Sequence, residues 1–175
     1  MQKKVLWLFG LSGAGKSTIA QSISEQLKQQ NIVHLLLDGD ELRAGVNKDL
    51  GFSDHDRTEN IRRAAEIAKI ISNQNIVCIC SFITPLLSLR NLVRNTLKDD
   101  VELFFIDTPI EECIKRDVKG LYKKAQNNQI NNFTGISGKF EYPSKEEKII
   151  NISTIGKRPE ECALEILSKL KISVY

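Results

Sequence analysis

The stretch GLSGAGKST at residues 10–18, which directly follows the apolar run VLWLF at residues 5–9, constrains the fold more than any other part of the chain. It matches the pattern G-x-x-x-x-G-K-[ST], with Lys16 and Ser17 at its end. The glycines let the backbone curl so that successive N–H groups converge on phosphate oxygens, and the helix that follows adds the positive end of its dipole. The pattern therefore predicts a phosphate-binding loop between a strand and a helix.

Apolar runs alternate with segments of helical period along the rest of the chain. The runs at residues 4–9, 32–37, 76–81 and 101–106 are continuous enough for strands that are buried on both faces. Between them lie helical stripes, such as Ile19, Ile23 and Leu27, and two later helices are expected to begin at Pro109 and Pro159. Repeated strand–helix units predict an α/β fold of the P-loop NTPase type, with helices flanking a parallel β-sheet in a single domain of residues 1–175.

Composition excludes several other classes of protein. The 25 basic and 22 acidic residues leave a net charge of only +3, which disfavours nucleic acid as a partner. The apolar runs are too short to span a membrane and the N-terminus lacks a signal-peptide pattern, so we expect a cytoplasmic protein. The cysteines show no zinc-site spacing, and we expect Cys78 and Cys80 to be small buried side chains on one face of a strand.

The chemistry of a nucleoside triphosphate explains the polar residues of the loop and of the second strand end. Lys16 would reach the β- and γ-phosphates, and Ser17 with Asp38 would hold Mg²⁺. Asp38 and Asp40 follow the second apolar run, and ligands of α/β sheets bind at the carboxyl ends of strands. An alternative role for these acids is helix capping, and we expect Asp40 to combine some capping with substrate contact. The N-K-x-D element of guanine-specific GTPases is absent, since NKDL at residues 47–50 has the wrong spacing.

Five segments together carry a family resemblance. They are GLSGAGKST, LDGDELRAGVNKDLGFSDHDRTENIRR, SFITP, DTPIEECIKRDVKGLYKKA and NFTGI, in order from residue 10 to residue 136, with KRPEECALEIL closing the chain. This set resembles adenylylsulfate kinase, which phosphorylates adenosine 5′-phosphosulfate on its 3′-hydroxyl. The resemblance implies a homodimer, a functional link to an ATP sulfurylase, and a mobile lid at approximately residues 116–140. It agrees with the polar, weakly periodic stretch at residues 123–140.

The resemblance also assigns residues to the site. It implies that Lys16, Asp38, Asp40 and Ser81 are catalytic. It implies that ATP is bound by Gly10, Leu11, Ser12, Gly13, Ala14, Gly15, Lys16, Ser17, Thr18 and Arg116. It implies that adenylylsulfate is bound by Asp40, Arg43, Phe52, Arg57, Asn60, Ile83, Lys119 and Phe133.

Physical chemistry supports several of these roles independently. Two polyanionic substrates in one cleft require forked cations such as Arg43 and Arg57, and Phe52 and Phe133 offer flat faces for adenine. The alternative role for each arginine is a solvated helix position, which we favour for Arg62 and Arg63. The alternative for each phenylalanine is the core, which the polar surroundings of Phe133 in NFTG disfavour.

Ser81 raises a choice between two mechanisms. It aligns with a serine that can carry phosphate, yet no histidine lies beside it in the sequence to serve as a base. We therefore expect direct in-line transfer to the acceptor hydroxyl rather than a phosphoserine intermediate.

Two stretches depart from the family pattern. Thr84 replaces a usual serine, and Leu86 and Leu87 stand where the family usually has a Tyr-Arg pair, which removes an expected positive charge. Residues 137–139, Ser-Gly-Lys, lack the usual acid and proline. The sequence thus predicts transfer of the γ-phosphoryl of Mg·ATP to adenosine 5′-phosphosulfate. The alternatives are another small-molecule P-loop kinase and an ATP-binding regulator without catalysis.

Overall fold

A five-stranded parallel β-sheet forms the centre of the computed structural model, which describes residues 4–170, so the ends of the predicted 1–175 domain lie outside the described residues. The strand order is β2-β3-β1-β4-β5, and every neighbouring pair is parallel. The strands are β1 (Val5–Phe9), β2 (His34–Asp38), β3 (Val77–Phe82), β4 (Val101–Asp107) and β5 (Ile150–Ser153). The predicted fold class is confirmed.

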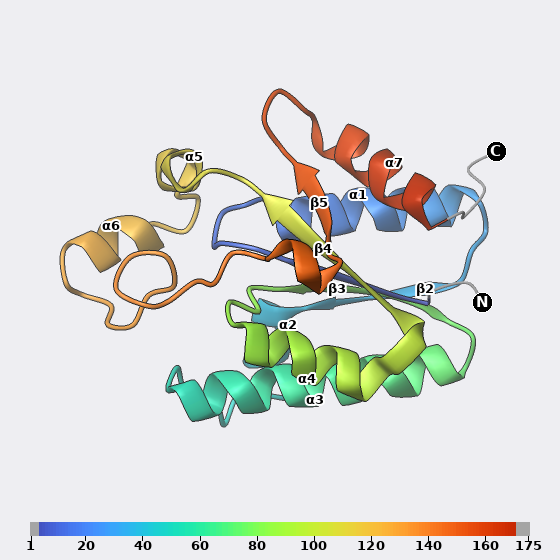
Figure 1. The fold of residues 1–175 in the computed structure, drawn as a ribbon, viewed down its shortest axis with the longest axis horizontal. Helices are drawn as coiled ribbons and strands as arrows, with labels where there is room; N and C mark the ends of the chain where they lie inside the picture. Colours follow the sequence, from blue (N-terminus) through green and yellow to red (C-terminus); the bar gives the residue numbers. More distant parts are fainter. Residues whose placement is uncertain (1–3, 171–175) are drawn as a thin grey trace.

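Helices cover both faces of this sheet. They are α1 (Lys16–Gln29), α2 (Gly39–Ala44), α3 (Asp54–Asn73), α4 (Leu87–Leu97), α5 (Ile110–Arg116), α6 (Leu121–Gln126) and α7 (Pro159–Lys169), with short 3₁₀ turns at Lys98–Asp100 and Lys145–Glu147. Figure 1 shows α1 and α7 on one face, α3 and α4 on the other, and α5 and α6 beyond the carboxyl end of β4. No helix within residues 4–170 is long and apolar enough to cross a membrane.

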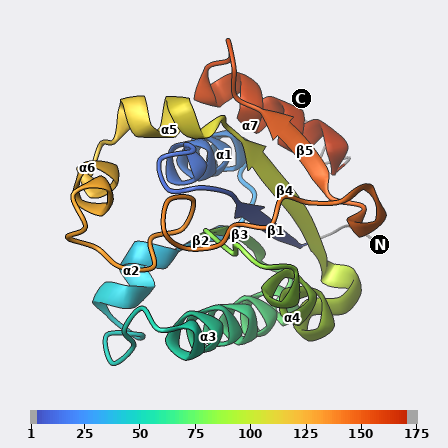
Figure 2. The ribbon, with the colours of Figure 1, turned by 60° about the vertical axis from the view of Figure 1, so that its left-hand side comes forward.

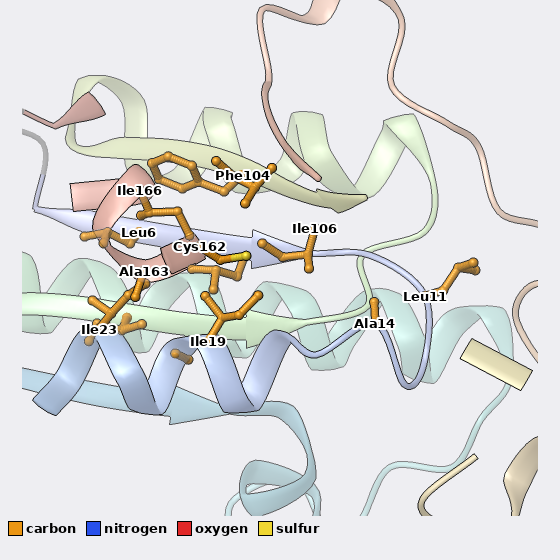
Figure 3. Close-up of a cluster of buried hydrophobic side chains, with 14 of the residues drawn as sticks. Leu6, Leu11, Ala14, Ile19, Ile23, Phe104, Ile106, Cys162, Ala163 and Ile166 are labelled. Atoms are coloured by element: carbon orange, nitrogen blue, oxygen red, sulfur yellow. The ribbon is translucent and has the colours of Figure 1, made fainter. Parts of the chain in front are cut away.

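The central strand β1 divides the core into two layers. Leu6 and Leu8 pack with residues of α1 and α7, as Figure 3 shows for Leu6, whereas Val5, Trp7 and Phe9 belong to the cluster under α3 and α4. All five residues are fully buried, because a strand with a neighbour on each side and helices on both faces has no wet surface. This burial explains why the run VLWLF is continuously apolar.

The predicted strands lie within two residues of the observed ones, but burial on both faces is wrong for β2. This strand is at the sheet edge, and Leu35 remains 41% exposed. Cys78 and Cys80 are buried with their sulfur atoms 3.6 Å apart, as expected for one face of β3. The sequence analysis did not identify β5 or α4.

Helix starts follow local capping chemistry. Pro159 is the first residue of α7, as predicted. Pro109 is the N-cap of α5, so that helix begins at Ile110, one residue later than predicted. Ser53 caps α3 by accepting the backbone N–H of Asp56 at 3.1 Å. These caps set the directions in which the helices leave the functional edge of the sheet.

Candidate active site

A cleft of about 1140 Å³ opens at the carboxyl ends of the strands, where ligands of parallel α/β sheets bind. Figure 2 shows α2, α5, α6 and the loop after α6 around this end of the fold. Of the residues predicted for the site, Gly10 and Leu11 do not line the cleft. The lining ones are Ser12, Gly13, Ala14, Gly15, Lys16, Ser17, Thr18, Asp38, Asp40, Arg43, Phe52, Arg57, Asn60, Ser81, Ile83, Arg116, Lys119 and Phe133.

Three of the six residues in the loop at residues 10–15 are glycines with a positive φ, a backbone conformation that other residues rarely adopt. Gly10 has φ +153°, and a Cβ added there would lie 2.7 Å from the backbone oxygen of Ile106 in β4. Gly10 therefore acts through close packing of the loop onto the sheet rather than by lining the cleft. The following helix α1 has neither a side-chain cap nor an acidic residue in its first turn. Its first N–H groups are therefore left for an anion.

Lys16 lies at the base of the cleft with only 8% of its surface exposed. Its Nζ donates to the backbone oxygen of Leu11 at 2.7 Å, across the loop. Burial lowers the pKa of Lys16 to about 8, although Asp38 and Asp40 act in the opposite direction. The ammonium is therefore poorly solvated and suited to pairing with phosphate.

Ser17, Asp38 and Ser81 bring three oxygen-bearing side chains together beside the loop. Ser17 Oγ donates to Asp38 Oδ2 at 2.6 Å and lies 3.2 Å from Ser81 Oγ. Hydroxyl and carboxylate oxygens are the ligands that Mg²⁺ prefers, so the donor set fits that ion. Within residues 4–170 no cluster of three or more His, Cys, Asp or Glu could enclose a metal, and Mg²⁺ bound through substrate phosphates requires none.

The expectation for Asp40 at the start of α2 is confirmed in part, because Asp40 is an acidic residue of the first helical turn. Asp38, not Asp40, is the N-cap of α2, and Asp38 Oδ1 accepts the backbone N–H of Asp40 at 2.8 Å. Asp38 thus has one oxygen on the helix and the other on Ser17. Its side chain is fixed by both contacts, and the Asp40 carboxylate is left to face the cleft.

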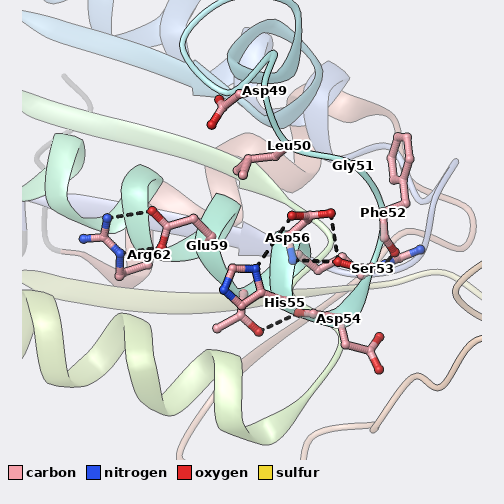
Figure 4. Close-up of polar contacts among 12 residues, drawn as sticks. Asp49, Leu50, Gly51, Phe52, Ser53, Asp54, His55, Asp56, Glu59 and Arg62 are labelled. Carbon is pink, nitrogen blue, oxygen red and sulfur yellow. Dashed lines mark hydrogen bonds and ion pairs between the residues drawn. The ribbon is translucent and has the colours of Figure 1, made fainter.

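Arg43, Phe52 and Arg57 form a cationic and aromatic wall on the far side of the cleft. The Arg43 guanidinium lies 4.6 Å from the Phe52 ring centroid, and that of Arg57 lies 5.9 Å from it. The Phe52 ring is 66% exposed, and Figure 4 shows it beyond the Ser53 cap of α3, directed away from the helix. Partial burial lowers the pKa of both arginines, which remain charged. Most of the Phe52 surface is open to a stacking partner, although the Arg43 guanidinium already lies over the ring.

Arg57 is not the solvated helix residue that the sequence left as an alternative. Its Nε donates to Phe52 O at 2.9 Å, Nη1 to Thr134 Oγ1 at 3.0 Å and Nη2 to Asn132 O at 2.7 Å. Arg57 therefore joins the start of α3 to the lid. Arg62 and Arg63, in contrast, form ion pairs with Glu59 on the outer side of α3.

Asn60 is oriented by a residue that the sequence analysis did not identify. Its Oδ1 accepts from Nδ2 of Asn47 at 3.0 Å, and Asn47 is fully buried. Because its carbonyl is occupied, the Asn60 amide group is left as the donor toward the cleft. The only sequence signal was the polar Asn47 within the resembling segment.

The lid contacts both the start of α2 and the phosphate-binding loop. Lys119 forms an ion pair with Asp40, and Tyr122 Oη donates to the backbone oxygen of Ser12 at 2.8 Å. Phe133 is only 8% exposed and packs edge-on against Tyr122, with ring centroids 5.0 Å apart. The expectation that Phe133 lies outside the core is therefore wrong, because tertiary contacts bury a residue whose sequence neighbours are polar. It still borders the cleft.

Further lining residues come from the end of the chain. Thr154 follows β5, Lys157 lies in the loop before α7, and Pro159 and Cys162 belong to the first turn of α7. Thr154 Oγ1 lies 2.7 Å from Thr108 Oγ1, which also bonds the oxygen of Ala14 at 2.9 Å. The segment KRPEE was a signal for this region, but β5 was not recognised.

The two departures from the family pattern lie side by side. The backbone N–H of Leu87 donates to Glu141 Oε2 at 2.7 Å, and Lys139 pairs with the same carboxylate at 2.5 Å. Leu87 is 42% exposed at the start of α4.

A phosphate-binding loop before α1, acids at the end of β2 and a lid over parallel strands define a P-loop kinase fold. The adenylylsulphate kinase family model matches residues 2–151, and the chain therefore belongs to this family. The adenylyl-sulfate kinase of Clostridium acetobutylicum is 48% identical over 167 residues, covering 95% of this chain and 82% of that protein.

Two further relatives add structural and architectural detail. The structure of the Mycobacterium tuberculosis APS kinase CysC in complex with AMPPNP and APS is 36% identical, with a TM-score of 0.91, and covers 97% of this chain and 98% of that one. The bifunctional enzyme NodQ of Rhizobium tropici is 47% identical over 93% of this chain, which spans only 26% of NodQ.

The contact of Gly10 with β4 gives a test of the loop. In Gly10→Ala the new Cβ meets backbone that cannot move aside, so we expect destabilisation of at least about 1–3 kcal/mol together with weaker ATP binding. In Gly156→Ala the residue has φ +69° but nothing within 4 Å of the new Cβ, so only the strain of about 1 kcal/mol applies. Urea denaturation of both variants measures the difference, and equal losses would contradict the packing role.

The lowered pKa of Lys16 predicts pH-dependent ATP binding. Below a pKa of about 8 the amine is already charged, whereas above it ATP binding must be accompanied by proton uptake. We expect affinity to fall by up to about tenfold per pH unit above 8. Calorimetry at pH 7 and 9 in buffers of different ionisation enthalpy measures the uptake. Lys16→Ala should remove this dependence, and the same dependence in that variant would refute the assignment.

Proposed function

We propose that the chain transfers the γ-phosphoryl group of Mg·ATP to the 3′-hydroxyl of adenosine 5′-phosphosulfate, giving 3′-phosphoadenosine 5′-phosphosulfate and ADP. The observation that carries the proposal is one cleft with two chemically different halves. One half is the loop with Lys16, and the other is the wall of Arg43, Phe52 and Arg57. The APS kinase complex with AMPPNP and APS supports it, since that protein shares the fold over nearly its whole length.

In the ATP half, the loop amides and the start of α1 hold the phosphates, and Lys16 neutralises the charge that develops on the transferred group. Arg116 lines the same half of the cleft. Ser17 and Asp38 would hold Mg²⁺, which supplies charge neutralisation at the β- and γ-phosphates. Removing divalent cations with a chelator should therefore abolish turnover.

In the acceptor half, Arg43 and Arg57 face the phosphosulfate, and Phe52 and Phe133 offer faces for adenine. Asn60 and Ile83 border the ribose, and Lys119 approaches from the lid. Asp40 accepts a hydrogen bond from the 3′-hydroxyl and then its proton. The 3′-oxygen bonds to the γ-phosphorus while the bond to the β,γ-bridging oxygen breaks.

Direct transfer is favoured over a phosphoserine intermediate. Ser81 is only 3% exposed, and its Oγ lies 3.2 Å from Ser17 Oγ. No histidine lines the cleft among the described residues, and both oxygens of the neighbouring Asp38 carboxylate accept hydrogen bonds from Ser17 and from Asp40 N–H rather than from Ser81. We assign Ser81 a position beside the transferred phosphate.

The proposed reaction is tested by coupled measurement of ADP release. We expect ATP turnover to be stimulated strongly by adenosine 5′-phosphosulfate and not by shikimate or gluconate. Shikimate kinase and gluconokinase share the fold at only 21% and 16% identity, so their substrates are suitable controls. Absence of stimulation by adenosine 5′-phosphosulfate would reject the proposed acceptor.

Arg57→Lys tests the acceptor half separately. Lysine keeps the charge but cannot make the three contacts of the guanidinium with Phe52, Asn132 and Thr134. We expect a loss of about 1.5–3 kcal/mol, seen mainly in the KM for adenosine 5′-phosphosulfate. Arg62→Lys on the outer side of α3 is the matched control. Equal changes in the KM values of both nucleotides would remove Arg57 from the acceptor site.

Three further features stay predictions. A homodimer is to be tested by the mass in solution. A functional link to an ATP sulfurylase is consistent with a bifunctional relative of which this chain spans 26%. The four free, buried cysteines Cys78, Cys80, Cys113 and Cys162 fit the reducing conditions of the cytoplasm, where we place the protein.

A further inference from the structure

Arg90 in α4 is a fully buried arginine that the mechanism described so far does not use. Its Nε donates to Glu147 Oε2 at 2.6 Å and its Nη2 to Glu147 Oε1 at 2.9 Å, a two-pronged ion pair. The Glu147 side chain is itself only 8% exposed. A guanidinium without water requires such a partner, because an unpaired buried charge is strongly unfavourable.

The remaining contacts of Arg90 join two segments that border the cleft. Its Nη1 donates to the backbone oxygens of Pro85, at 3.3 Å, and of Glu141, at 3.0 Å. Pro85 ends the turn Ile83–Pro85, which lines the cleft after β3. Glu141 lies in the segment 139–147, here called the strap, which begins at the end of the lid and continues beyond it. The backbone N–H of Glu141 also donates to Pro85 O at 2.8 Å.

The turn that Arg90 holds is strained. Thr84 has φ +42°, a conformation unfavourable for a β-branched residue, and it is 1% exposed. Its Oγ1 accepts from Trp7 Nε1 at 3.0 Å. Strain of this kind persists only where the surroundings fix the backbone, and it concentrates at functional sites. Trp7 fixes the turn from below, and Arg90 with the strap fixes its end.

Stability alone does not account for this ion pair. Replacing a buried ion pair with apolar side chains of similar volume is often neutral or stabilising, because desolvation offsets the attraction. What an apolar pair cannot do is donate to two backbone carbonyls at once. The specific capacity of Arg90 is therefore to fix the turn and the strap relative to each other.

We propose that Arg90, oriented by Glu147, is a positioning residue for the acceptor half of the cleft. It sets the turn Ile83–Pro85 and ties it to the end of the lid. This inference rests on the proposed function for the identity of the acceptor. The ATP half has its own anchors, since Thr108 bonds Ala14 O and Tyr122 bonds Ser12 O. Loss of Arg90 is therefore expected to affect the acceptor far more than ATP.

The test is the double variant Arg90→Met with Glu147→Leu, which removes both charges and keeps the volume. We expect a folded protein with a moderately lowered thermal midpoint, because Glu141 O and Ser144 N–H lose their partners. The KM for adenosine 5′-phosphosulfate should rise roughly 10- to 100-fold, the scale of a misplaced binding group. The dissociation constant for ATP, measured without acceptor, should change by less than about threefold, because Arg90 makes no hydrogen bond to Thr108 or Tyr122, which hold the phosphate-binding loop. Arg62→Met is the control, since Arg62 also forms a two-pronged pair with a glutamate but on the surface.

Arg90→Lys covers the case in which the double variant does not fold. Lysine keeps the charge for Glu147 but cannot reach Glu147 and two carbonyls together, so the acceptor KM should again rise selectively. An unchanged acceptor KM in whichever variant folds, or equal changes for ATP and acceptor, would overturn the proposal.

Limited trypsin digestion separates this inference from the proposed function. Lys119, Lys123, Lys124 and Lys139 are potential cleavage sites on the lid and strap. Cleavage there should be faster in the Arg90 variants than in Arg62→Met, whatever the acceptor. If the parent does not use adenosine 5′-phosphosulfate, the proposed function fails, but the cleavage rate still tests whether Arg90 fixes the strap to the turn Ile83–Pro85. Unchanged cleavage would reject it.

Discussion

The pairing of β1 with a parallel neighbour on each side is the constraint on which the rest of the site depends. Because β1 lies between β3 and β4, the loop that follows it emerges between the ends of both neighbours. Gly10 donates to Ile83 O at 3.2 Å on the β3 side and lies against Ile106 O on the β4 side. The phosphate loop is therefore held by both neighbouring strands, at the edge of the sheet where we propose that the two substrates meet.

Charge is distributed over this edge in a way that fits two anions. The buried Lys16 and the open start of α1 lie on one side, and Arg43 and Arg57 lie on the other. The carboxylates between them are few and fixed, since Asp38 is bonded to both Ser17 and α2. A site of this kind gains from excluding water, because each charge interaction strengthens as the local dielectric constant falls. The lid contacts of Lys119 and Arg57 supply that enclosure.

Local signals explain what the sequence could and could not reveal. The sequence predicts Lys16, Ser17 and Asp38 as site residues because the loop motif and the end of a strand are each contiguous patterns in the chain. The strand β5, only four residues long and partly exposed, carries no such pattern. The prediction that Phe133 lies outside the core is wrong because Phe133 packs against Tyr122 of α6, a contact that its polar sequence neighbours do not indicate. The pair of Arg90 and Glu147 is separated by 57 positions, so only the folded chain brings it together.

Glu141 contacts both Leu87 and Lys139, two residues that depart from the family pattern. The family pattern has an arginine at position 87, whereas here the positive charge comes from Lys139, which pairs with Glu141 while Glu141 accepts the Leu87 N–H. The contact with Lys139, followed by that with Leu87, lowers the pKa of Glu141. A lysine of the strap therefore supplies a positive charge beside the first residue of α4, through its pair with Glu141.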